Sequence, residues 1–204
     1  MLPEQVVLAS NNRGKLQELT ELLSGLHVRV LPQSAYAVPE IEETGLTFVE
    51  NAILKARNAA LHARIPAIAD DSGIEVEFLG GAPGIYSARY AGNGASDADN
   101  LQLLLQQVQQ SGLQQPSARY QCVIVFVHHG ADATPVIAHG TWHGQLVAEP
   151  KGNNGFGYDP MFFVPTHGCT SAELPPAEKN RISHRGQAMQ DLLRKLAALK
   201  GNDY

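Results

Sequence analysis

The motif Asp70-Asp71-Ser72-Gly73 holds the side chains of this sequence that are best suited to metal and phosphate chemistry. It follows three apolar residues, so we expect a strand over 67–70 that ends at the two carboxylates. The carboxylates repel each other, and no cationic residue stands beside them in the sequence. A magnesium ion on a phosphate substrate would relieve this repulsion, because Mg²⁺ usually binds one or two carboxylates together with substrate phosphates. Ser72 could donate its hydroxyl to a phosphate. The alternative is an acidic turn in which Gly73 is left-handed.

A polar loop near the N-terminus is a second candidate for binding phosphate. It lies between the apolar run 6–9 and a set of leucines at helical spacing that begins at Leu16. Free amides and the helix dipole attract anions to such a helix start. The glycine spacing is not that of a Walker A loop. The alternative is a polar helix cap with a solvated lysine. The candidate residues are Ser10, Asn11, Asn12, Arg13, Gly14 and Lys15.

A second pair of carboxylates, Glu42 and Glu43, precedes a predicted helix over 48–63. Thr47 and Glu50 match a capping box at the start of that helix. The pair could complete a metal site with the first acidic motif. The alternative is that both acids only complement the positive end of the helix dipole.

The segment 152–160 combines three glycines, two aromatic residues and one acid. Glycines on both sides of Phe156 would free its ring to stack on a planar base, a contact that contributes roughly 1–3 kcal/mol. Asp159 could accept a hydrogen bond from the edge of that base. The alternative is an ordinary glycine-rich turn whose aromatic side chains fill the core.

A basic run over 178–185 precedes the last predicted helix. Lys179, Arg181, His184 and Arg185 could hold phosphates or donate to a carbonyl on a base, since arginine offers a planar fork of donors. The alternative is a solvated basic face on a helix.

Helices and strands alternate along the chain, and they must position these segments. We expect strands over 6–9, 67–70, 74–78, 122–127, 136–147 and 161–164, and helices over 16–23, 48–63, 96–110 and 189–199. Some strands are continuously apolar and others alternate. This mixture predicts an α/β fold with a mixed sheet.

Length and composition limit the classes of protein. The 204 residues, 44% of them hydrophobic, fit a single domain over 1–204 that needs no disulfide to fold. The net charge of −5 and the lack of a basic stripe argue against a nucleic-acid partner. Cys122 opens an apolar run and is expected to be a buried thiol, and the two cysteines form no zinc pattern. No signal peptide or membrane-length apolar run is apparent, so we expect a cytoplasmic protein that has no membrane partner.

Taken in order, these motifs resemble the noncanonical purine nucleoside triphosphate pyrophosphatase family, also called the dITP/XTP or inosine triphosphate pyrophosphatases. The resemblance covers residues 5 to about 198. Asn11 is the main departure, because many members have glycine in this part of the loop. The matching residues are Ser10, Asn12 and Lys15; Glu43-Thr44-Gly45, Phe48, Glu50-Asn51-Ala52 and Lys55-Ala56; Asp70-Asp71-Ser72-Gly73 and residues 80–89; and residues 156–160, Glu178-Lys179 and Ser183-His184-Arg185.

The resemblance implies an elongated fold with two lobes, a nucleotide-binding cleft between them and a homodimer. It implies triphosphate contacts from residues 10–15 and Ser72, and Mg²⁺ near Glu43 and Asp71, with Glu42 as a possible substitute for Glu43. It implies base and sugar contacts from Phe156, Gly157, Tyr158, Asp159, Lys179, His184 and Arg185.

The mechanism that we expect is in-line attack of water on the α-phosphorus, with Asp71 as general base and pyrophosphate as the leaving group. Arg185 or His184 would select ITP, dITP and XTP over ATP by donating to the 6-oxo group of the base. One alternative is a pyrophosphatase of modified pyrimidine triphosphates. Another is a regulatory module that binds nucleotide without hydrolysing it.

Overall fold

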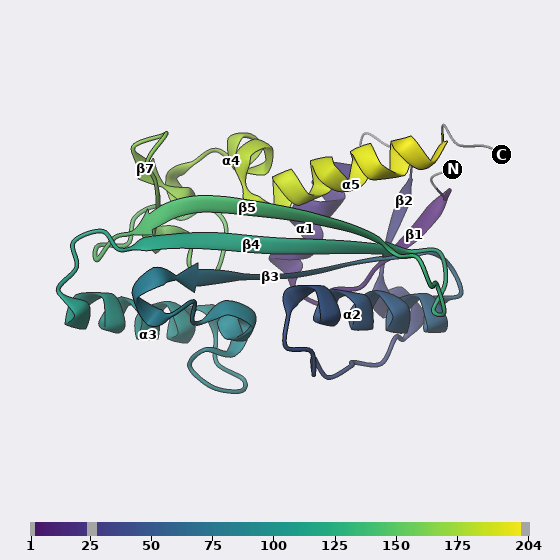
Figure 1. The fold of residues 1–204 in the computed structure, drawn as a ribbon, viewed down its shortest axis with the longest axis horizontal. Helices are drawn as coiled ribbons and strands as arrows, with labels where there is room; N and C mark the ends of the chain where they lie inside the picture. The colour runs from purple at the N-terminus through teal and green to yellow at the C-terminus, as the bar shows by residue number, and fades with distance from the viewer. Residues whose placement is uncertain (1–2, 24–27, 201–204) are drawn as a thin grey trace. The chain divides into compact units, whose positions relative to one another are not determined.

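A computed structural model describes residues 3–23 and 28–200. Its strands form one hydrogen-bonded sheet in the order β2-β1-β3-β4-β5-β6-β7 (Figure 1). β1 pairs in parallel with β2 and β3, whereas β6 pairs antiparallel with β5 and β7, so the predicted α/β fold with a mixed sheet is confirmed. The strands are β1 (Gln5–Leu8), β2 (Arg29–Pro32), β3 (Ala67–Val76), β4 (Ser117–Val127), β5 (Val136–Leu146), β6 (Phe162–Val164) and β7 (Cys169–Thr170). The helices are α1 (Arg13–Leu23), α2 (Phe48–Ala63), α3 (Asp97–Ser111), α4 (Pro176–Ile182) and α5 (His184–Lys200).

By its internal contacts the chain divides into two compact units. That these units form one domain with two lobes stays a prediction. The first unit comprises the described parts of 1–71, 122–140 and 184–204, and the second comprises 72–121 and 141–183. Within residues 3–23 and 28–200, no helix combines the length and the apolar character that crossing a membrane requires.

The first unit has three layers. Side chains of α1 and α5 pack on one face of the strands around Leu8, Ile124 and Phe126. The small side chains of α2, among them Ala52, Ala56 and Ala59, pack on the other face with Val125. Figure 1 shows α2 on one side of these strands and α5 on the other. Side-chain alternation along each strand therefore sends consecutive residues toward different helices.

The second unit is built around a cluster of aromatic residues. Tyr120, Trp142 and Phe162 lie in ring contact, with the centroids of Tyr120 and Phe162 4.6 Å apart. Leu104 and Val108 of α3 pack on this cluster. The glycine-rich segment 152–160 is anchored to this core through Tyr158, which is only 5% exposed and belongs to the same cluster.

Strand β3 is the main departure from the predicted elements. The two expected strands, 67–70 and 74–78, are one continuous strand from Ala67 to Val76, and 77–79 form a short 3₁₀ turn. Asp70 and Asp71 therefore lie inside a strand rather than at its end. The alternative interpretation, an acidic turn with a left-handed Gly73, is also wrong, because Gly73 is not among the glycines with positive φ. Aspartate has a low propensity for strands. Burial of the residues on both sides of the motif outweighs that propensity and keeps the strand continuous.

We expect Gly73→Ala to destabilise the protein. A Cβ atom at this position would lie 2.2 Å from the Gly84 carbonyl oxygen and 2.5 Å from Ser87 Oγ. The carbonyl belongs to backbone and cannot rotate away, so the overlap should cost about 1–3 kcal/mol or more. Urea unfolding measures this, with Gly157→Ala as a comparison at a site whose Cβ would meet open space but whose φ is +61°. Wild-type stability of Gly73→Ala would show that the packing at this point is loose.

The helix ends follow local sequence signals. Thr47 caps α2, and its hydroxyl oxygen accepts from the Glu50 amide, which is the first half of the predicted capping box. The Glu50 carboxylate accepts from the Leu46 amide and the Thr47 hydroxyl. Ser96 caps α3 with a full capping box. Both cysteines are free and Cys122 is buried, as expected; burial raises the pKa of its thiol to about 12.

Candidate active site

The two neighbouring aspartates of β3 point to opposite faces of the sheet. Asp70 lies two residues after Ile68 and so shares its face of the sheet, where Ile68 packs with α1 and α5. Asp71 shares the opposite face with Ala69, which packs with α2. Lys15 of α1 and Arg185 of α5 pair with Asp70, and Lys55 of α2 pairs with Asp71. The predicted unrelieved repulsion is therefore wrong, because strand alternation separates the side chains and tertiary structure supplies the cations.

Asp70 lies at the centre of a buried ion-pair group. Its Oδ2 is 3.0 Å from Lys15 Nζ and 3.5 Å from Arg185 Nη2, and Arg185 also pairs with Glu18 of α1. Burial alone would raise the pKa of Asp70, but Lys15, Arg185 and Lys55 outweigh it and hold the pKa well below its usual range. Asp70 is thus ionised at neutral pH, and it fixes two cations at the carboxyl end of β1.

Asp71 faces Lys55 and Asn51 of α2. Lys55 Nζ is 2.8 Å from Asp71 Oδ1, and Asn51 Nδ2 is 3.5 Å from Oδ2. Burial raises the pKa of Asp71, and Glu43 adds to this, although Lys55 and Lys15 act in the opposite direction. A raised pKa makes a carboxylate a stronger proton acceptor. The net direction could not be derived from the sequence.

Glu43 lies nearer this site than Glu42 does. Lys55 Nζ is 2.8 Å from Glu43 Oε1, so one ammonium group bridges Glu43 and Asp71. Glu42 is exposed. Burial alone would lower the pKa of Lys55, but Asp71, Asp70 and Glu43 outweigh it and raise the pKa to about 12. The two carboxylates thus already hold a cationic group between their oxygens.

These residues fit a magnesium ion that shares its ligands with a substrate. Among the residues that the structure describes, no three His, Cys, Asp or Glu side chains form a group able to hold a metal. Glu43 and Asp71 instead offer two carboxylate oxygens that converge on one positive charge. Two carboxylates completed by phosphate oxygens and water is the usual protein environment of Mg²⁺.

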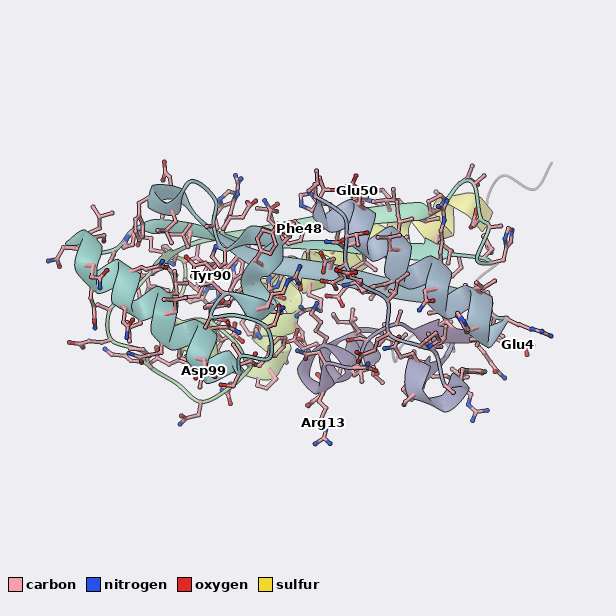
Figure 2. All side chains as sticks on the ribbon, turned by 90° about the horizontal axis from the view of Figure 1, so that it is seen from below. Glu4, Arg13, Phe48, Glu50, Tyr90 and Asp99 are labelled. Carbon is pink, nitrogen blue, oxygen red and sulfur yellow. The ribbon has the colours of Figure 1, made fainter. Side chains whose placement is uncertain are left out.

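The polar loop before α1 is ordered by its own side chains. The Asn12 carboxamide oxygen accepts from the Lys15 amide at 3.0 Å, and the Ser10 hydroxyl accepts from the Asn12 amide at 3.2 Å. Asn11 binds Glu40 and Gln33. The helix cap of the alternative interpretation is therefore present, but its solvated lysine is wrong, because Lys15 pairs with Asp70. Arg13 is exposed and points away from the ribbon (Figure 2).

In the second unit, Asp159 is a buried acceptor for four donors. Its Oδ1 accepts from Ser171 Oγ at 2.9 Å and Tyr120 Oη at 3.5 Å. Its Oδ2 accepts from the Phe156 amide at 2.9 Å and Lys179 Nζ at 2.7 Å. Asp159 is 3% exposed, and both of its carboxylate oxygens accept hydrogen bonds from within the protein. The predicted hydrogen bond from Asp159 to a base edge would have to compete with these internal donors, and it stays a prediction.

Lys179 and Phe156 are arranged around that carboxylate. Lys179 is 4% exposed, and its Nζ lies 5.3 Å from the centroid of the half-buried Phe156 ring. Gly155 has a φ of +76°, and a Cβ there would lie 2.0 Å from Asp159 Oδ2, so only glycine fits beside the ion pair. This packing explains the glycine without a ligand, and stacking of the Phe156 ring on a base stays a prediction. The Tyr158 hydroxyl donates to the Ser87 carbonyl oxygen at 2.7 Å, which makes Tyr158 a core residue.

Comparison with known proteins identifies the family. Residues 6–195 match the model of the Ham1 family. The chain belongs to the Ham1 family. It is 53% identical over 195 residues to the dITP/XTP pyrophosphatase of Vibrio parahaemolyticus, covering 96% of this chain and 98% of that protein. It is 54% identical over 190 residues to the dITP/XTP pyrophosphatase of Escherichia coli K12, covering 93% and 96%.

A solved structure of a HAM1 protein from Coxiella burnetii has the same fold. Its TM-score is 0.87 at 49% identity, covering 96% of this chain and all of that one. The family named by the sequence motifs is thereby confirmed, and the fold class with it.

In this Ham1-family chain the basic run is not the solvated face that was the alternative interpretation. Lys179, His184 and Arg185 are each less than a twentieth exposed, with values of 4%, 4% and 2%. Arg181 alone follows that alternative, because its side chain is 66% exposed and pairs with Glu178. The chain ends α4 at Ile182 and begins α5 at His184, so His184 and Arg185 stand at a helix start.

Sequence reasoning assigned no role to four residues of these ion-pair groups: Glu18, Lys55, Tyr120 and Ser171. Lys55 gave a local signal, because it is a charged residue beside the inward alanine stripe of α2. Glu18 lies one turn after Lys15 on α1, but nothing in the sequence links it to Arg185. Ser171 and Tyr120 gave no signal, since their contacts to Asp159 depend on how distant segments pack.

Proposed function

We propose that this protein hydrolyses noncanonical purine nucleoside triphosphates, namely ITP, dITP and XTP, to the nucleoside monophosphate and pyrophosphate. The observation that carries the proposal is the set of cations and carboxylates around β3: Lys15, Lys55 and Arg185 with Glu43, Asp70 and Asp71. Cations of this kind bind phosphates, and the carboxylates suit a divalent ion and a proton acceptor. The names of the relatives support the substrate class.

The triphosphate end is assigned to residues of the first unit, together with Ser72. Lys15 is paired with Asp70 and would neutralise charge that develops on the leaving group. Residues 10–14 would contribute backbone amides and short polar groups. Mg²⁺ held by Glu43 and Asp71 would withdraw charge from the phosphate oxygens and ease deprotonation of water.

Asp71 is the candidate general base. A water oxygen forms a bond to the α-phosphorus, the bond from that phosphorus to the bridging α–β oxygen breaks, and pyrophosphate leaves with the electron pair. The water proton passes to Asp71, whose pKa is raised by burial. Its neighbour Asp70 is kept ionised by Lys15 and Arg185 and is assigned to positioning.

Recognition of the base is assigned to Phe156 by stacking, with Gly157 beside it, and to Lys179, His184 and Arg185 by hydrogen bonding. A buried donor that meets the 6-oxo group of hypoxanthine or xanthine would be left unpaired by adenine. Asp159 would act through Lys179 and Phe156, which it holds in place.

A nucleotide panel tests this proposal. ITP, dITP, XTP, GTP, ATP and a modified pyrimidine triphosphate are compared by kcat/KM, with product identification and with and without Mg²⁺. We expect monophosphate and pyrophosphate from the first three and a requirement for Mg²⁺. Equal kcat/KM on ATP and ITP would contradict the proposed recognition of the base. Diphosphate and phosphate as products would contradict the proposed attack at the α-phosphorus.

Glu43 and Glu42 provide a matched pair. Glu43→Gln should lower kcat about 10–100-fold or more, because altering a metal's carboxylate environment typically costs that much in activity or affinity. Glu42→Gln should leave kcat within about twofold, because exposed surface changes have small effects. Titrating Mg²⁺ in the assay distinguishes the two variants. The reverse ranking would show that Glu42 is the ligand.

The remaining expectations stay predictions. A regulator that binds nucleotide without hydrolysis is excluded if pyrophosphate is released in the panel. The names of the relatives do not favour the pyrimidine alternative. Light scattering tests the predicted homodimer, and cell fractionation tests the predicted cytoplasmic location.

A further inference from the structure

Lys55 occupies the position at which the two proposed metal ligands converge. Its Nζ lies 2.8 Å from Glu43 Oε1 and 2.8 Å from Asp71 Oδ1. These carboxylates come from the segment before α2 and from β3, so a single ammonium group joins two parts of the first unit. Its side chain is 16% exposed, which means that the contact is largely shielded from solvent screening.

The surroundings hold both carboxylates against this ammonium group. Asn51, one turn before Lys55 on α2, donates to Asp71 Oδ2 and accepts from the Gly45 amide at 2.8 Å. A Cβ at Gly45 would lie 2.6 Å from Glu50 Cβ, so the segment that carries Glu43 packs tightly on the start of α2. The bridge is therefore built into the packing of the helix.

We propose that Lys55 is an internal counterion that prevents Glu43 and Asp71 from binding a divalent cation until a triphosphate is present. A divalent ion that enters alone must either displace the ammonium group or lie beside it, and the two positive charges repel. A triphosphate brings enough negative charge to attract both. The consequence is that the protein takes up metal with the nucleotide rather than before it.

This inference rests on the proposed metal site, but its test uses no nucleotide. Failure of the test would therefore leave the nucleotide panel unaffected. Lys55→Met removes the charge and keeps the length of the side chain. Lys195→Met is the matched control, because it makes the same change at an exposed lysine of α5 that pairs with Asp191 at 2.6 Å.

The measurement is thermal unfolding in chelator and in increasing MgCl₂, at an ionic strength held constant with NaCl. The wild type and Lys195→Met should shift little with Mg²⁺. Lys55→Met should melt lower than the wild type in chelator, because three carboxylates lose a nearby cation, and Mg²⁺ should restore it in a saturable way. Calorimetry with Mg²⁺ alone should show affinity about tenfold or more above that of the wild type.

Two further variants locate the effect. Lys55→Arg keeps the charge and should keep the weak response to Mg²⁺, whereas Lys55→Met combined with Glu43→Gln should lose the restored response. The proposal is overturned if Lys55→Met binds Mg²⁺ no more tightly than the wild type. It is equally overturned if the variant melts low, or fails to fold, in Mg²⁺ as it does in chelator.

Discussion

Asp71→Asn is expected to lower kcat by about 10²–10⁴-fold, the usual contribution of a general base. The amide cannot accept the water proton, although it keeps the shape of the side chain and can still accept from Lys55. At saturating Mg²⁺, which compensates for weaker metal binding by the variant, nucleotide affinity should change much less, because Lys15 and Arg185 pair with Asp70. Single-turnover rates with dITP, together with binding of a nonhydrolysable analogue, separate the two effects.

The same substitution should leave the protein folded. Burial raises the pKa of Asp71, so the stability due to its own titration falls as pH rises through its folded-state pKa, and the amide can still accept from Lys55. The amide should shift the melting temperature by only a few degrees. Near-wild-type turnover by Asp71→Asn would remove this carboxylate from the chemistry.

Lys179→Met is expected to cost about 3–5 kcal/mol of folding free energy, because it leaves the Asp159 carboxylate buried without its cation. The pair has an Nζ–Oδ2 distance of 2.7 Å, and its side chains are 5% and 4% exposed. For a chain of this size the melting temperature should fall by roughly 10 °C. Urea unfolding monitored by the fluorescence of Trp142, which lies in the same unit, measures the loss.

Arg181→Met is the control for this prediction. It removes a cation from the same helix, but its side chain is 66% exposed, so the cost should be about 1 kcal/mol or less. The double variant Asp159→Asn with Lys179→Met should be more stable than the sum of the single losses predicts, because neither charge is left alone. Additive losses would show that the two residues do not act as a pair.

The sequence alone indicated the family, the fold class and most helix boundaries. Helix signals are local: Thr47 and Ser96 cap their helices through contacts that span three residues. The chemistry-bearing segments were also visible, because charged side chains such as those of Asp70 and Lys15 stand directly beside apolar runs or glycines. Residue types and short spacings carry this information without any knowledge of the fold.

Only the tertiary structure decided which charges meet. Lys15 and Asp70, like Lys55 and Asp71, are distant in the sequence, and their pairing follows from how α1 and α2 pack on β3. The direction of each pKa shift depends on that packing, because burial and nearby charge act in opposite directions. Strand alternation sends Asp70 and Asp71 to different faces of the sheet. Which helix covers each face depends on tertiary packing, so the sequence of the motif does not determine the partners of either carboxylate.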